Sequence, residues 1–175
     1  MHKDGPFTVG DNYRKRNGVL RYSEGSEGNG FNVTLMGYSA KWHATDQIPL
    51  RAVQAGTLGR FDSVDQTSGG EASRYSVSGA WRQATGSSAS QVNAYLVRSR
   101  LDLFSNFTYF LDSPVNGDQF AQPDRRMTTG IHASHSWSSS LLGRTSENTV
   151  GVQFQNDNIS NGLYNSVARQ ITSTT

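Results

Sequence analysis

The alternation of apolar and polar residues between Tyr95 and Leu103 is the feature that most constrains the fold of this chain. At every second position from Tyr95 the residues are apolar with one exception, and the residues between them include Arg98, Arg100 and Asp102. Successive side chains of a β-strand point to opposite faces, so this pattern predicts a strand with one apolar and one polar face. Similar segments recur along the chain, each about twice the roughly 5 to 6 residues of a typical globular strand. The sequence therefore predicts a series of long amphipathic strands.

Composition agrees with a β-protein and argues against several functional classes. The 175 residues are 34% hydrophobic, 10% aromatic and only 17% charged, with a mean hydropathy of -0.59. Abundant Gly, Ser, Thr, Asn and Gln favour strands and turns over helices. A net charge of +2 is too small to argue for a nucleic-acid partner, and none is expected. The absence of Cys excludes disulfides, zinc–thiolate sites and thiol chemistry.

A membrane-spanning helix is not expected from this sequence. No segment approaches the roughly 20 consecutive apolar residues that such a helix needs, and the first residues lead into no apolar signal-peptide core. A transmembrane strand needs only about 9 to 11 residues and shows lipid every second one, so a membrane barrel stays possible. A chain without a signal peptide is expected to be cytoplasmic or a section of a longer precursor.

Turn-forming residues divide the chain into seven expected strands. These cover about residues 13–23, 31–43, 73–84, 91–111, 125–137 and 148–157, with a seventh still running at Thr175. Modest turns follow the first, third and fifth strands, the last of them over Ser138 to Ser146. Longer loops, Ala44 to Gly70 and Asp112 to Asp124, follow the second and fourth. Outer-membrane barrels show this asymmetry, so we expect these two loops to face outside the cell.

The alternation also predicts which side chains face lipid. The apolar parity from Tyr95 should contact lipid, and Arg98, Arg100 and Asp102 should line a lumen or contact a plug. Trp81 and Trp137 fall near the expected periplasmic ends of strands and Trp42 near an outer end, as aromatic girdles require.

The segment from Phe31 to Trp42 fits this alternation poorly. Its apolar parity changes between Leu35 and Met36. A bulge, or a lumen packed by protein, is expected there.

The sequence predicts an all-β fold, an antiparallel up-and-down transmembrane β-barrel of which this chain supplies only part. Known bacterial barrels begin at eight strands, and an open edge in lipid leaves polar backbone groups unsatisfied. Six strands and an incomplete seventh cannot close, so we expect a fragment or a wall completed by other chain. A soluble β-sandwich binding or adhesin-like module, or a β-solenoid, is the alternative, since such sheets also alternate.

No catalytic, metal or cofactor site is expected, and the chain is not expected to be an enzyme. His132 and His135 have an odd spacing, which sends their rings to opposite faces of a strand, and no known hydrolase or phosphate-loop motif occurs. Candidate ligand-binding residues are the lumen candidates and two loop acids. They are Arg82, Arg98, Arg100, Asp46 and Asp118. With Arg21, the arginines could attract an anionic solute or pair with acids of an interior plug.

Many short runs in a fixed order carry a resemblance to a known family. The runs are Asp11–Lys15, Asn17–Ser23, Asn29–Phe31, Trp42–Pro49, Arg74–Ser76, Leu101–Leu111, Gly117–Phe120 and Arg125–Arg126. Together they resemble the barrel of proteobacterial TonB-dependent outer-membrane receptors. The similarity covers nearly the whole chain, about Gly5 to Thr174.

This resemblance implies a barrel of about 22 strands around an N-terminal plug domain, in the bacterial outer membrane. Such receptors take up scarce solutes such as siderophore-bound iron or cobalamin, driven through the TonB protein. Expected partners are outer-membrane lipid, the plug, the remaining barrel strands, TonB acting through the plug, and a small-molecule or metal-chelate ligand. Residues 1–175 contain no TonB box, plug or signal peptide, and no final strand ending in an aromatic residue. They are therefore expected to form a middle section of the barrel wall.

Overall fold

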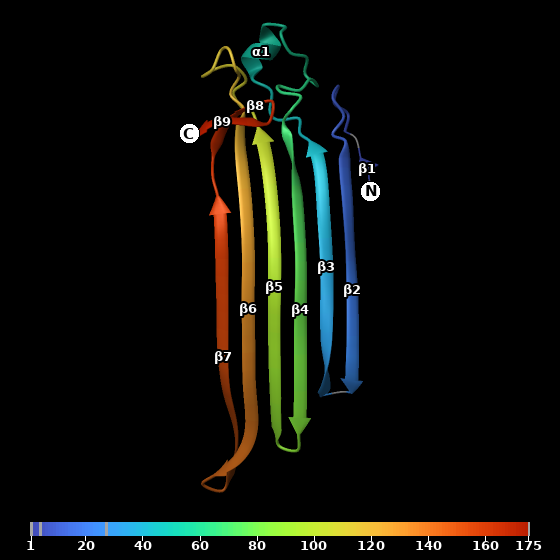
Figure 1. Ribbon diagram of the computed structural model, residues 1–175, viewed down its shortest axis with the longest axis vertical. Coiled ribbons are helices and arrows are strands. Elements are labelled where there is room, and N and C mark those ends of the chain that lie inside the picture. Colours follow the sequence, from blue (N-terminus) through green and yellow to red (C-terminus); the bar gives the residue numbers. More distant parts are fainter. Residues whose placement is uncertain (1, 4, 27, 175) are drawn as a thin grey trace.

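The computed structural model is a single curved antiparallel sheet that forms a half-barrel (Figure 1). It describes residues 2–3, 5–26 and 28–174. In this part of the chain the wall consists of six long strands: β2 (Tyr13–Ser26), β3 (Asn29–His43), β4 (Gly69–Thr85), β5 (Ser88–Ser105), β6 (Phe120–Leu141) and β7 (Arg144–Asn161). The short elements are β1 (His2–Lys3), β8 (Tyr164–Val167), β9 (Gln170–Thr174) and helix α1 (Leu50–Gln54). The predicted all-β antiparallel fold is confirmed.

Tight turns and long loops lie at opposite ends of the wall (Figure 1). Each long strand pairs with its sequence neighbour, and two-residue turns join β4 to β5 and β6 to β7. Gly86 and Gly143 occupy these turns with φ of 56° and 73°, a conformation that glycine adopts without steric cost. Residues 44–68 and 106–119 form long loops at the other end. The predicted alternation of short and long connections is confirmed.

Several predicted boundaries are wrong. The strand predicted to reach Leu111 ends at Ser105, because the Asn106 side chain accepts a hydrogen bond from the Tyr109 backbone N–H (2.9 Å) and turns the chain. The strand predicted to begin at Arg125 begins at Phe120. The turn predicted over residues 138–146 is two residues long, because the serines there continue the ladder between β6 and β7.

The predicted seventh strand, expected to be still running at Thr175, is not one continuous strand. After β7 the chain forms a short hairpin of β8 and β9, and β8 pairs with the first residues of β6. Ala168 and Arg169 form its turn with φ of 48° and 67°. The hairpin lies across the loop end of the wall (Figure 1).

The strand register divides the side chains between two faces. On what we call the apolar face, the middle of the wall carries a band of large hydrophobic side chains. They are Leu20, Tyr22, Phe31, Val33, Leu35, Val77, Trp81, Val92, Leu96, Ile131, Val152 and Phe154. Opposite them, on the polar face, lie Arg21, Asn32, Ser78, Arg82, Asn93, His132, Gln153 and Gln155. The sheet is one layer thick, so Leu20 and Val152 are 68% and 64% exposed.

Residues between Tyr95 and Leu103 face the opposite way from the prediction. Tyr95 pairs with Ser78 and Gly130 on the polar face, where its ring occupies the space over Gly130 and its hydroxyl donates to Gln155 (3.1 Å). Arg98, which pairs with Tyr75 and Met127, therefore lies on the apolar face, as do Arg100 and Asp102. The prediction failed because β5 extends beyond the apolar band, so charge near its end does not identify its lumen face.

Strand β3 contains no bulge, since its pairing with β2 and β4 runs without interruption. Met36, Tyr38 and Trp42 lie on the polar face, where the Lys15 ammonium is 5.6 Å from the centre of the Tyr38 ring. Trp42 thus lies on the opposite face from Trp81 and Trp137, so the expectation that the three share one face is wrong.

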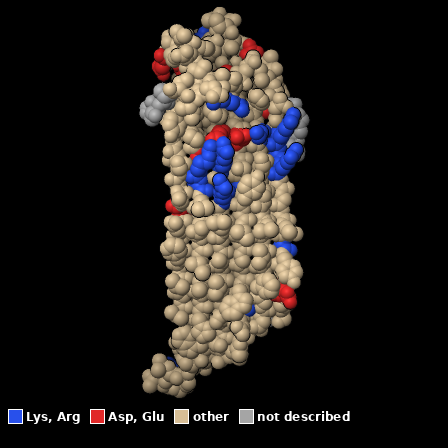
Figure 2. Space-filling view, in the orientation of Figure 1, with Lys and Arg blue, Asp and Glu red and all other residues tan. Residues whose placement is uncertain are grey.

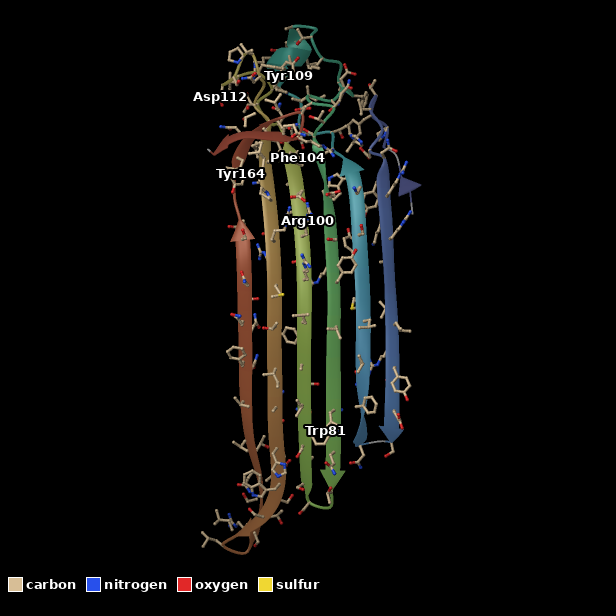
Figure 3. All side chains as sticks on the ribbon, in the orientation of Figure 1. Trp81, Arg100, Phe104, Tyr109, Asp112 and Tyr164 are labelled. Carbon is tan, nitrogen blue, oxygen red and sulfur yellow. The ribbon has the colours of Figure 1, made fainter. Side chains whose placement is uncertain are left out.

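Trp81 and Trp137 do share the apolar face near the turn end. Trp81 lies near that end and Arg100 toward the loop end (Figure 3).

No helix among the described residues is long and apolar enough to cross a membrane.

Candidate functional site

The loops at the end of the wall associate into one cluster, which we call the loop cap. It consists of residues 44–68, residues 106–119 and the β8–β9 hairpin (Figure 3). Buried apolar side chains of the described residues, Ala40, Ala52, Val64 and Ala121, all belong to the cap or to the strand ends beneath it. Pro49 precedes α1 with φ of -61°, which favours helix initiation. From α1, Arg51 donates to the Thr108 carbonyl (2.7 Å) and joins two loops. The cap is the best-packed part of the molecule.

Gln119 is the centre of the loop cap and is only 3% exposed. Its Nε2 donates to Asp65 Oδ2 (2.8 Å) and to Thr67 Oγ1 (2.7 Å). Its Oε1 accepts from Ser166 Oγ (3.0 Å) and from the Arg169 backbone N–H (2.8 Å). This amide, which belongs to the loop of residues 106–119, thus satisfies groups of the other long loop and of the hairpin, which requires all its donors and acceptors to be aligned.

Arg169 anchors the hairpin on the loop that follows β3. Its guanidinium donates to the Thr67 carbonyl (2.7 Å) and lies 5.6 Å from the centre of the Phe104 ring. A left-handed backbone costs a residue with a Cβ about 1–2 kcal/mol. These contacts offset that cost at a turn where glycine would be usual.

Asp118 organises the loop between β5 and β6. Its carboxylate accepts hydrogen bonds from the Thr108 hydroxyl (2.8 Å) and from the backbone N–H groups of Leu111 (2.7 Å) and Ser113 (2.7 Å). The Asp112 N–H also donates to it (3.2 Å). Partial burial raises the pKa of Asp118, but these donors outweigh it and hold the pKa below its usual value. The predicted ligand contact is therefore saturated by its own loop.

Asp118→Ala is expected to loosen residues 108–118 without affecting the strands. Each lost bond to a charged acceptor contributes about 1.5–3 kcal/mol when buried and less here, so exchange of the Leu111 and Ser113 amides should accelerate about tenfold. Because the folded pKa is depressed, this stabilisation is present above the ordinary carboxyl pKa and is lost as pH falls through the lower folded value. Hydrogen exchange of the variant and of the unchanged protein, each at neutral and at acidic pH, tests this role of Asp118. Equal protection at neutral pH would contradict the assigned role.

Asp46 also has a structural contact. Its Oδ2 accepts from the Asn106 backbone N–H (3.1 Å), and Asn106 itself is 2% exposed. This bond fixes the start of one long loop against the other. Both predicted loop acids therefore hold the cap together.

The predicted arginines do not form one site. Arg82 and Arg21 lie on the polar face toward the turn end, and both line a groove of about 470 Å³. Arg98 and Arg100 lie on the apolar face toward the loop end. The expectation that all of them line one lumen is therefore wrong for Arg98 and Arg100.

The two histidines of β6 point to opposite faces, as predicted. His135 lies on the apolar face, where its Nδ1 is 2.7 Å from Ser90 Oγ and its ring stacks on Trp137. His132 pairs with Asn93 on the polar face. In the chain as described, no three His, Asp or Glu side chains are grouped as metal ligands would be.

The outer surface of the loop cap carries exposed apolar side chains. Leu50, Phe61, Phe107, Phe110 and Val115 are 68%, 54%, 49%, 42% and 87% exposed. Such side chains can contact the apolar parts of a ligand or of a neighbouring chain. Sequence reasoning missed these residues and Gln119, because no local pattern distinguishes them from ordinary loop residues.

Comparisons with protein-family models, with curated proteins and with solved structures gave no match to this chain.

Proposed function

We propose that this chain is a section of the barrel wall of a TonB-dependent outer-membrane receptor, which mediates energised uptake of a scarce solute. The solute class is that of siderophore-bound iron or cobalamin. The observation that carries the proposal is a half-barrel one layer thick, with an uncovered apolar band on one face and polar side chains on the other. A soluble sandwich would cover such a band with a second sheet.

The height of the apolar band supports lipid as its partner. Tyr75 marks its upper edge and Trp137 its lower edge. Trp137 pairs with Ser88, which pairs with Thr85, so the lower edge is at the level of Thr85 on β4. From Tyr75 to Thr85 is ten residues, about 33 Å along a strand. At a tilt of about 40° this becomes about 25 Å, the height of the apolar band in outer-membrane barrels. Long loops at only one end also agree with that class.

Each part of the chain then has a passive role. The apolar face contacts lipid and the polar face lines the lumen, where a plug domain would contact it. On that face Asp157 accepts from Thr128 (2.6 Å) and Gln155 (2.7 Å), so its charge is held by neighbouring donors. The loop cap, with its exposed apolar side chains, helps to capture the ligand. The wall catalyses no reaction, and energy coupling resides in the plug and TonB.

Fractionation of the intact gene product from its bacterial host tests this proposal. We expect recovery in the outer membrane, and loss of solute uptake when TonB is deleted. Recovery in the cytosol would overturn it. The chain alone, expressed in water, should aggregate without detergent, whereas a monomer with a cooperative thermal transition would favour a soluble β-sandwich binding or adhesin-like module.

A further inference from the structure

Basic side chains gather on the apolar face just beyond the apolar band, toward the loop end (Figure 2). We call this group the arginine band: Arg14, Arg16, Lys41, Arg98, Arg100 and Arg125. The described acidic residues on this part of the face are Glu71 and Asp102. Six basic and two acidic groups leave a net formal charge of +4. A soluble anion or an anionic surface would be attracted to it.

The arginine band contains a groove of about 530 Å³ between β4 and β7. Arg98, Arg100 and Arg125 line it, with the hydroxyls of Ser73 and Ser160 and the amide of Asn158. Guanidinium groups bind phosphate oxygens with two parallel N–H donors, and hydroxyl and amide groups can donate to the remaining oxygens. Tyr75 and Met127 line the same groove on the side of the apolar band. The groove is therefore cationic at one end and apolar at the other.

Asp102 holds two of these arginines in place without neutralising the groove. Its carboxylate contacts Arg100 Nε (2.8 Å) and Arg125 Nη2 (2.5 Å), and it is only 15% exposed. Arg125 also donates to the Leu101 carbonyl (2.7 Å). Arg98 is exposed and has no ion-pair partner within residues 2–3, 5–26 and 28–174. Arg100 is also 4.0 Å from Glu71. Asp102 and Glu71 thus offset part of the charge of Arg100 and Arg125, and Arg98 is the arginine without an ion pair among the described residues.

The level of the groove matches that of lipid headgroups. Arg98 is in the row of Tyr75, at the edge of the apolar band, and Arg100 is two residues farther along β5. Two residues span about 7 Å of strand, which is close to the thickness of one headgroup layer, about 5–7 Å. A headgroup in this groove would place its acyl chains beside Val77 and Leu96.

We propose that this groove binds the phosphorylated headgroup of an outer-leaflet lipid through Arg98, Arg100 and Arg125. The inference rests on the proposed function, because only a wall in a membrane has a headgroup layer at this level. Charge complementarity and continuity with the apolar band favour a lipid over a soluble anion. An acidic protein partner would leave the apolar end of the groove, at Tyr75 and Met127, without a contact.

Native mass spectrometry of the intact protein in detergent tests the proposal. The probes are phosphatidic acid, whose headgroup is a phosphate monoester, and phosphatidylglycerol and phosphatidylcholine as comparisons. We expect retention of phosphatidic acid, and Arg98→Gln should weaken it about tenfold, the effect of one charge-assisted hydrogen bond. Arg98→Gln removes no ion pair among the described residues, so the wall should still fold. Arg74→Gln is the matched control, because Arg74 pairs with Ser99 at nearly the same level on the polar face.

Three results would overturn the inference. One is equal loss of lipid in Arg98→Gln and Arg74→Gln, and another is equal binding of all three lipids. The third is displacement of phosphatidic acid by inorganic phosphate at equal concentration, which would identify a site for soluble anions. If the protein is recovered in the outer membrane but shows any of these results, the inference fails and the proposed function stands. Recovery in the cytosol would overturn both.

Discussion

Ile131→Arg is expected to prevent stable insertion of the barrel wall. Ile131 lies on the apolar face between Ala94 and Phe154, in the row of Gly79, which is near the middle of the ten residues from Tyr75 to Thr85. An arginine facing lipid at the midplane of a barrel costs about 2–4 kcal/mol. Its neighbours in the row are hydrophobic, so the guanidinium would find no partner there. The measurement is the urea dependence of folding of the intact protein into phosphatidylcholine vesicles.

His132→Arg is the matched control, because it places the same side chain one residue away on the polar face. We expect it to change the free energy of folding by less than about 1 kcal/mol, as substitutions exposed to water usually do. Similar destabilisation by both variants would show that steric crowding, and not lipid exposure, is responsible. A neutral Ile131→Arg would contradict the assignment of this face to lipid.

The long strands could be predicted from sequence because their signal is local. Each strand is longer than a globular strand and alternates along most of its length, so neighbouring residues suffice to find it. Strand ends were harder to place. Ser138, Ser139 and Ser140 have turn-like composition, yet they pair with β7, and cross-strand hydrogen bonds satisfy their backbone. Composition alone cannot indicate that a partner strand is present.

Assignment of faces failed where strands leave the apolar band. Around Arg98 and Arg100, the charged side chains predict a lumen face. The register places both on the apolar face, because β5 continues beyond the band into the arginine band. A rule based on parity holds only within the apolar band, and the sequence does not indicate where that band ends. The same reason explains Trp42, an aromatic residue near a strand end that lies on the polar face.

Only part of the candidate site could be predicted. The sequence indicates both loops and marks Asp118 as a candidate. The role of Asp118 as the acceptor for its own loop depends on a fold that local composition does not specify. Gln119 has partners between 47 and 54 residues away. Such contacts arise from the tertiary arrangement, and a single glutamine in a polar loop carries no sequence signal for them.

The second large effect is expected from Gln119→Glu in the loop cap. The substitution keeps the shape of the side chain but replaces Nε2, which donates to Asp65 Oδ2 over 2.8 Å, by an oxygen. Two carboxylates would then face each other in a buried site, and Thr67 Oγ1 would lose its donor. We expect the free energy of cap opening to fall by about 3 kcal/mol, which corresponds to about 100-fold faster amide exchange. The Ser166 amide, which donates to the Gln119 carbonyl (2.9 Å), is the most direct probe.

The pH dependence distinguishes repulsion from a packing defect. A carboxyl beside another carboxylate has a raised pKa, so it is charged, and the cap weakest, above that raised value. As pH falls below it, the protonated group can again donate to Asp65, and protection should return in part. Gln122→Glu is the control, because Gln122 is exposed and the same change there should leave cap exchange unaltered at every pH. Loss of protection that does not depend on pH would mean that Gln119 acts by shape alone. The cap would then be held by Arg169 and Asn106, whose contacts the substitution leaves in place.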